Sequence, residues 1–339
     1  MKLIQFLLFF IAVLPAAGQS TVVYTTPSGY VKYDLQNGFN YLGLTVHETV
    51  IASGIIGTPA GTTLPTSIID LTTSLGASDA NSKVIIEITG GDHVGYILEA
   101  TAWSGADFTG VAGLGSLASL EGDTFQVRKA TSISDLFGAT NTVGLTEGTL
   151  QTADVIWVSA GSGGFDKYFY SPGDPTAFPV PIAEGWKDSV GNDASNAKIN
   201  YLDGIFIQRR GSLLSITVFG EIKTTSTNIA IEGNGFNFFS GIYPAATTLS
   251  DSNLSTVLTH GDLATGDIVW MPDGVSSWKK YYYTDGDPSA FPVPVTAGWK
   301  DSVGADASAI EITSGMVIQR RSTTATNALY TPHILYNSL

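Results

Sequence analysis

The 339-residue sequence contains no cysteine. This absence excludes a disulfide framework, a thiol nucleophile, and cysteine-ligated zinc or iron–sulfur sites. The fold must therefore be stabilised by apolar burial and by pairing between β-strands. The chain is long enough for two or three domains, each with a sizeable core.

Basic residues are scarce, with 16 lysines and arginines against 30 aspartates and glutamates. The formal net charge of −14 at pH 7 repels nucleic acid and anionic membranes. We therefore expect no nucleic-acid partner.

After the N-terminus, the sequence has no apolar run of the roughly 20 residues that a membrane-spanning helix needs. The N-terminus has a basic residue at Lys2, a run over 3–14 that is apolar except for Gln5, and small residues over 16–18. This order is typical of a secretory signal peptide. We predict a cleaved signal peptide over 1–18 and a protein that is secreted or held in the cell envelope. No transmembrane segment is expected in the mature chain.

The motifs of several common enzyme classes are also missing. The four histidines lack metal-ligand spacing, and no nucleophile elbow or phosphate-binding glycine loop occurs. A carboxylate pair that cleaves glycosides has no fixed spacing in sequence. A polysaccharide-degrading enzyme with its site in the N-terminal third is therefore kept as a weaker alternative to a non-enzymatic protein.

Glycine, threonine, serine, β-branched residues and aromatics are abundant in this chain. Alternating β-branched runs are separated by clusters of Gly, Asn, Asp and Pro. This pattern is typical of many short strands. We predict an all-β fold made of tandem sandwich or barrel-like modules.

The second and third thirds of the chain are two copies of one module. FPVPIAEGWKDSVG at 178–191 and FPVPVTAGWKDSVG at 291–304 share 11 of 14 positions at an offset of 113. Downstream, GIFIQRR ending at Arg210 matches GMVIQRR ending at Arg321. Collinear matches of this length indicate a duplication.

The matched segments predict the organisation of the chain. The strand GDTFQVR at 122–128 is expected to open copy one, and GNGFNFF at 233–239 to open copy two. The expected regions are an N-terminal β-rich region over 19–120, copy one over 121–212, a connecting strand over 213–230, copy two over 231–322 and a C-terminal tail over 323–339.

Two local patterns refine this organisation. Ser132 to Asp135 and Thr248 to Asp251 have the spacing of a capping box, which predicts one short helix in each copy. Asn-Gly-Phe-Asn occurs at 37–40 and again at 234–237. The N-terminal region is therefore expected to hold a partial relative of the module.

The order GDTFQVR, TSISDLFGATNTVGL, ADVIWV, KYFY, GW-x-D and GIFIQRR resembles a family of exported bacterial β-proteins. Members of this family typically occur as many paralogues in one genome, and no activity is assigned to them. The resemblance covers most of 121–322 and carries no catalytic residues to transfer. It implies export, a β-rich fold and a role in the cell envelope or outside the cell.

Both copies contain the same aromatic cluster, in which the segment 168–170 matches 281–283 and a tryptophan follows. Aromatic faces beside carboxylates and amides suit sugar binding, because a ring packs against the apolar face of a pyranose. The alternative is that these rings form the module core, which is the more usual place for aromatic residues. The candidate ligand-binding residues are Tyr168, Tyr170, Trp186, Tyr281, Tyr283 and Trp299.

Each copy also has an acidic turn, DSVGND at 188–193 and DSVGAD at 301–306. Oxygen ligands on a glycine-bearing turn can hold Ca²⁺, but the EF-hand pattern is absent. Asp and Gly also favour turns without any metal. The weak candidates for metal binding are Asp188, Asp193, Asp301 and Asp306, and no other cofactor is expected.

Two arginine pairs end matching strands, Arg209 with Arg210 and Arg320 with Arg321. Neighbouring strand residues face opposite ways, so one arginine of each pair can point inward. It would stack on Trp186 or Trp299, or pair with an aspartate of the module. We expect these arginines to stabilise the fold of each copy.

The leading interpretation is an exported, non-enzymatic structural or adhesion protein at the cell surface. The alternative is a carbohydrate-binding protein that uses the Tyr and Trp cluster of each module. Extracellular glycans or further copies of the chain are the expected partners.

Overall fold

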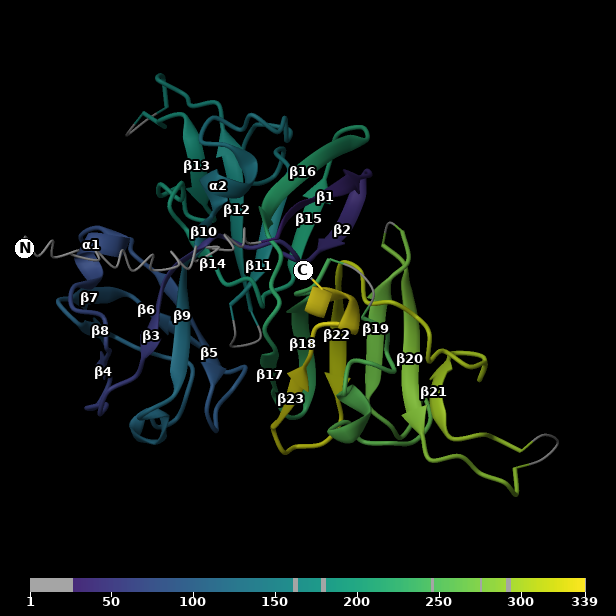
Figure 1. Cartoon of the computed structure of the whole chain (residues 1–339). Coiled ribbons are helices and arrows are strands. Elements are labelled where there is room, and N and C mark those ends of the chain that lie inside the picture. The colour runs from purple at the N-terminus through teal and green to yellow at the C-terminus, as the bar shows by residue number, and fades with distance from the viewer. Residues whose placement is uncertain are drawn as a thin grey trace, which may run out of the picture.

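The computed structural model describes residues 27–160, 164–177, 181–244, 247–274, 276–290 and 294–338. The predicted signal peptide over 1–18 lies outside the described residues. Within them, the chain is built from antiparallel sheets and has two short α-helices (Figure 1). The predicted all-β fold class is confirmed.

Module one is a sandwich of a five-stranded sheet and a two-stranded ribbon. The sheet has the order β13–β12–β11–β15–β2, and the ribbon pairs β1 with β16. Ile216 of the ribbon belongs to the same buried core as Ile156 and Ile207 of the sheet. The elements are β1 (Ser28–Leu35), β2 (Gly38–Leu42), β10 (Thr131–Ser132), α2 (Ile133–Phe137), β11 (Val155–Ser159), β12 (Phe165–Ser171), β13 (Gly185–Asp188), β14 (Lys198–Ile199), β15 (Ile205–Arg209) and β16 (Leu214–Glu221).

Module two repeats this architecture. Its sheet has the order β18–β22–β19–β20–β21, and its ribbon pairs β17 with β23. Ile229 and Tyr330 of the ribbon share a core with Val269 and Ile318 of the sheet. The elements are β17 (Thr227–Ile231), β18 (Gly235–Ser240), η2 (Leu254–Thr256), β19 (Ile268–Pro272), β20 (Trp278–Thr284), β21 (Gly298–Asp301), β22 (Gly315–Arg320), β23 (Thr326–Tyr330) and η3 (Ile334–Ser338).

A third body, which we call the insert, lies between β2 and β10 in the chain. It contains the sheets β3–β9–β5–β6 and β4–β8–β7 around its own core, which includes Leu64, Ile86 and Phe108. In Figure 1 it lies beside module one, away from β20 and β21. The elements are β3 (Val50–Ile55), β4 (Leu64–Pro65), α1 (Leu71–Leu75), β5 (Val84–Gly90), β6 (Ile97–Ala100), β7 (Ala102–Ser104), β8 (Asp107–Thr109), η1 (Ala118–Leu120) and β9 (Thr124–Lys129).

The opening strand of copy one differs from the expected one. Strand β9, which covers most of the expected opener 122–128, pairs with β3 and β5 inside the insert. The counterpart of β18 is β2, and an asparagine closes the turn before each strand, over four residues before β2 and five before β18. Asn40 donates its side-chain amide to the Gln36 carbonyl at 2.8 Å, and Asn237 donates to the Glu232 carbonyl at 3.1 Å. The repeated Asn-Gly-Phe-Asn therefore marks the true start of each sheet.

The strand pairing also reassigns the ends of the copies. The expected connecting strand contains β16, which closes module one on β1, and also β17, which opens module two. The expected tail contributes β23, which closes module two on β17. The strands of module one are therefore drawn from both sides of the insert.

The predicted capping boxes form, but a helix follows directly in one copy only. Ser132 and Asp135 cap α2, with Asp135 N–H donating to the Ser132 hydroxyl at 3.1 Å. In module two Asp251 N–H donates to Thr248 at 3.2 Å, but the segment is a turn followed by the 3₁₀ helix η2. Asn253 has φ of 57°, in the left-handed region, which breaks an α-helix at this point.

The two modules contact each other through the sheet faces that do not cover their own cores. Phe165 of module one packs on Phe238 of module two at 5.0 Å between ring centroids. The reciprocal pair, Trp278 with Tyr41, lies at 5.4 Å. Phe165 and Trp278 hold equivalent places in the two sheets, as do Tyr41 and Phe238. The interface is therefore isologous, like that of a two-fold homodimer.

Four buried charged side chains meet where the insert, module one and the segment between the modules come together. Arg128 of β9 lies 3.3 Å from Glu87 of β5 and 2.9 Å from Glu221 of β16. Lys223, in the segment that joins the modules, is fully buried and lies 3.3 Å from Glu87. We call these four residues the junction cluster. Burial alone would raise the pKa of Glu87, but Lys223 and Arg128 outweigh it and lower this pKa to about 2.

His47 connects this junction to module two. Its Nε2 lies 2.7 Å from the carbonyl oxygen of Ile242, and its ring packs on Tyr201 at 4.5 Å. Burial lowers the pKa of His47 from 6.5 to about 3, so the imidazole is neutral at pH 7. Its Nε2–H therefore donates to the carbonyl.

Arg128→Ala is expected to lower the free energy of unfolding by about 3–5 kcal/mol, because it leaves two buried carboxylates without this partner. Urea unfolding followed by circular dichroism measures the change. Lys32→Ala is the control, since the Lys32–Asp34 pair is more than half exposed and its loss should leave stability nearly unchanged. Equal effects of the two substitutions would contradict a structural role for the junction cluster.

His47 should make the folded protein sensitive to acid. The unfolded chain takes up a proton near pH 6.5, whereas the folded protein resists it down to about pH 3. The contribution of His47 to the free energy of unfolding is fully present above pH 6.5. It is lost as the pH falls from 6.5 towards 3, by up to about 1.4 kcal/mol per pH unit. When the pH is lowered from 8 to 3, the urea concentration at the unfolding midpoint should fall more steeply for the wild type than for His47→Gln. Parallel curves would disprove this linkage.

Candidate functional site

The two shared tryptophans are in the module cores. Trp186 is 0% exposed and Trp299 is 2% exposed, so neither ring has a face for a ligand. Each packs edge-on against a tyrosine, Tyr170 at 5.3 Å and Tyr283 at 5.6 Å. The prediction that these tryptophans bind a ligand is wrong. They are core residues, which was the alternative interpretation.

The four tyrosines of the predicted cluster have different surroundings. Tyr170 and Tyr281 are 2% and 3% exposed and belong to the cores. Tyr283 is half-buried and its ring lies 4.5 Å from that of His260. Tyr168 is half-buried and lines a polar pocket. Of the six candidates, Tyr168 alone lines this pocket.

The inward arginine of each pair binds a buried aspartate, which is one of the two arrangements expected from the sequence. Arg209 donates from its NH1 group to Asp154, whose carboxylate also accepts the backbone N–H of Arg210 at 2.6 Å. Arg320 donates to Asp267, which accepts the N–H of Arg321 at 2.7 Å.

The outer arginine of each pair donates to backbone carbonyls. Arg210 Nε bonds Ala153 O at 2.7 Å, and Arg321 Nε bonds Gly266 O at 2.6 Å. The two aspartates, Asp154 and Asp267, were not singled out from the sequence. They could have been found from the sequence, because both copies have an aspartate at the same position of the matched segments ADVIW and GDIVW.

The acidic turns use their carboxylates for backbone contacts. Asp188 Oδ1 accepts the N–H groups of Val190 and Asn192, both at 2.9 Å, and Asp301 accepts those of Val303 and Ala305 at 3.0 and 2.9 Å. Burial tends to raise the pKa of Asp188, but the bonds from Asn192 and the turn amides lower it overall.

The second acid of each turn also bonds locally. Asp193 accepts from the Ser195 hydroxyl at 2.7 Å, and Asp306 accepts from the Ser308 hydroxyl at 2.9 Å. In the described part of the chain, no group of three or more His, Asp or Glu residues is placed to hold a metal ion.

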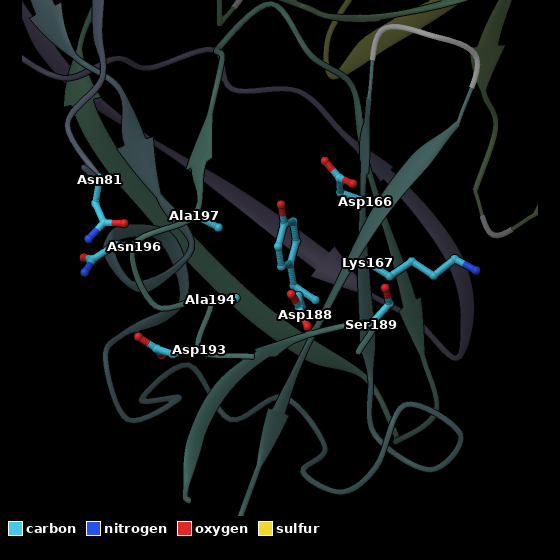
Figure 2. A pocket seen from close by; sticks show the side chains of 10 residues that line it. Asn81, Asp166, Lys167, Asp188, Ser189, Asp193, Ala194, Asn196 and Ala197 are labelled. Atoms are coloured by element: carbon cyan, nitrogen blue, oxygen red, sulfur yellow. The ribbon is translucent and has the colours of Figure 1, made fainter. Parts of the chain in front are cut away.

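The polar pocket beside Tyr168, which we call the Tyr168 pocket, has a volume of about 330 Å³. Figure 2 shows Asn81 and Asn196 together on one side and Asp166 on the other. Asp188 at the end of β13 and Asp193 in the following loop also line the pocket, together with the apolar Ala194 and Ala197. Its full lining is Asn81, Asp166, Lys167, Tyr168, Asp188, Ser189, Asp193, Ala194, Asn196 and Ala197.

The insert and module one build this pocket jointly, since Asn81 precedes β5 while Asp166 and Tyr168 lie on β12. Burial raises the pKa of Tyr168, and the charges of Asp166 and Asp188 raise it further, so the phenol is neutral at pH 7. Among the described residues, the side-chain amides of Asn81 and Asn196 have no hydrogen-bond partner. The pocket therefore offers one aromatic ring, unpaired amides and carboxylates.

Module two does not reproduce the Tyr168 pocket. Lys279 takes the place of Asp166, and it pairs with Asp273 at 3.0 Å. The counterpart of Tyr168 is the buried Tyr281, and the insert that supplies Asn81 occurs in module one alone. The equivalent region of module two therefore serves as an internal control for the role of the Tyr168 pocket.

Comparison of the chain with family models, curated proteins and solved structures found no match. No helix in the described part of the chain is long and apolar enough to cross a membrane.

Arg209→Ala should destabilise module one by about 3–5 kcal/mol, because Asp154 is fully buried and would keep an unpaired charge. Arg320→Ala should do the same to module two, since its contacts with Asp267 are equivalent. Arg210→Ala is the control, because this side chain is exposed and bonds a single carbonyl oxygen, and it should have a smaller effect. Melting temperatures measure all three, and a neutral Arg209→Ala would contradict the fold-stabilising role.

Proposed function

We propose that this protein is an exported, non-enzymatic adhesion protein that binds an extracellular carbohydrate in the Tyr168 pocket. The observation that carries the proposal is the half-buried Tyr168 ring placed among unpaired amides and carboxylates. An aromatic ring can pack on the apolar face of a sugar while amides and carboxylates hydrogen-bond its hydroxyl groups.

The size of the pocket supports a single sugar unit. The volume of about 330 Å³ lies at the lower end of the range for small-ligand pockets, which is about 300–1,000 Å³. The ligand is therefore one residue of a glycan, with the rest of the chain outside the pocket.

The polar groups have separate roles in this proposal. The side-chain amides of Asn81 and Asn196 can each donate and accept hydrogen bonds, whereas Asp166 offers carboxylate oxygens that accept them. Asp188 and Asp193 already accept bonds within their loop, so they hold the loop in shape beside the ligand. A neutral sugar rich in hydroxyl donors fits this set better than an anionic sugar does.

The joined architecture supports an adhesive role. The junction cluster joins the insert to module one and to the segment that leads into module two, and the aromatic interface joins the two modules. A load applied at the pocket would therefore be distributed over three cores. Export is supported by the signal-like N-terminal sequence.

Tyr168→Ala is expected to weaken glycan binding about tenfold, because burying roughly 50 Å² of the ring against a sugar is worth about 1.3 kcal/mol. Asp166→Lys, which copies module two, should also weaken it. Binding of the mature protein is screened on a glycan array and then measured by titration calorimetry. Tyr281→Ala is the matched control and should lower the melting temperature without changing affinity.

Two results would overturn the proposal. One is a folded wild-type protein that binds no glycan on the array. The other is equal loss of affinity in Tyr168→Ala and Tyr281→Ala, which would point to a general loss of structure rather than to a site.

A further inference from the structure

A second concave site lies beside the interface of the two modules. It is a groove of about 380 Å³ whose lining side chains are all apolar, and we call it the aromatic groove. Phe236 on its rim is 54% exposed. Exposed apolar surface gathered in one place is typical of an interaction site. The lining residues are Phe206, Phe236, Phe238, Trp270, Trp278 and Val317.

The duplication explains why the groove is open on the side of module two. Val317 of β22 occupies the place that Phe206 holds on β15 of module one, and the smaller side chain leaves space beside Trp270. On module one, Trp157 contacts Phe39 at 6.0 Å and Phe165 at 6.2 Å, so neighbouring rings pack around it.

A lysine stands at the edge of the groove. Lys280 on β20 lies directly opposite Trp270 on β19, and its Nζ is 4.4 Å from the Trp270 ring centroid. Trp270 is held in turn by a bond from its Nε1–H to Gln319 Oε1 at 3.3 Å. Among the described residues, Lys280 has no carboxylate partner. In a chain with almost twice as many acids as bases, this places an unpaired cation beside an apolar surface.

We propose that the aromatic groove binds a small amphiphilic anion, of the class of fatty-acid carboxylates. The apolar chain lies on Trp270, Phe236 and Val317, and the carboxylate pairs with Lys280 Nζ. The groove volume of about 380 Å³ lies at the lower end of the range for small-ligand sites, about 300–1,000 Å³, which suits an acid of about ten carbons. A sugar is a poorer fit, because the lining offers no hydrogen-bonding group to its hydroxyls.

This proposal is independent of the Tyr168 pocket. The two sites share no lining residue. A protein that binds no glycan could therefore still bind a fatty-acid carboxylate in the aromatic groove.

Decanoate below its micellar concentration is the probe, with decanol as its neutral counterpart. Binding to the mature protein is followed by tryptophan fluorescence, because Trp270 and Trp278 line the groove. Decanoate should bind saturably and more tightly than decanol. Trp270→Ala should weaken both ligands at least tenfold, because the apolar platform is lost.

Lys280→Met separates the charge from the apolar contact. It should weaken decanoate about three- to fivefold and leave decanol unchanged, since a partly exposed ion pair is worth at most about 1 kcal/mol. Lys167→Met is the matched control, because Lys167 lies over Trp157 in the same way at 4.0 Å but away from the groove. It should change neither affinity.

Several outcomes would overturn the proposal. Equal affinity for decanoate and decanol would show that the carboxylate does not contribute to binding. If neither ligand bound, the groove would not be a binding site for amphiphiles. Equal effects of Lys167→Met and Lys280→Met would show a non-specific charge effect. Dimerisation in light scattering that is abolished by Phe236→Ser, with no decanoate binding, would assign the groove to a second copy of the chain.

Discussion

The buried cluster of Glu87, Arg128, Glu221 and Lys223 is the interaction on which the relative placement of the three bodies depends. Its members come from the insert, from the last strand of module one and from the segment that leads into module two. The cluster contains two acidic and two basic side chains, so each buried charge has an opposite charge close to it in place of water. Removing one member leaves another unpaired, and the low-dielectric interior makes that costly. The cluster therefore favours one arrangement of the insert, β16 and the following segment over any other.

A second constraint is the two-fold relation between the modules. Reciprocal contacts such as Tyr41 with Trp278 and Phe238 with Phe165 arise when one surface packs on its own copy. The insert and a few substitutions break this symmetry. The Tyr168 pocket exists where the insert reaches module one, and the aromatic groove opens where Val317 replaces a phenylalanine. Both proposed sites thus lie at departures from symmetry rather than in the segments that the two copies share most closely.

The outcome for particular residues shows how far sequence patterns reach. The inward arginine of each pair contacts a buried aspartate, which is one of the two arrangements expected, because a charge on an inward strand position needs a partner nearby. The strongest repeat, GWKDSVG, indicated a shared feature, but its tryptophans are core residues and its aspartates bond within turns. Identity between copies reports a common constraint and does not say whether that constraint is packing or binding. Burial distinguishes the two, and burial depends on which strands pair.

The amino-acid sequence by itself determined the all-β class, the duplication and the inward arginines, because each follows from composition or from the spacing of a few residues. The tertiary structure alone decided that β2 and β16 belong to module one, since about 90 residues of insert separate β2 from the next strand of its module. It also decided that Asn81 meets Tyr168, and that Glu87 meets Lys223. These pairs are far apart in the chain, and no local pattern encodes a contact that depends on how three separate cores pack together.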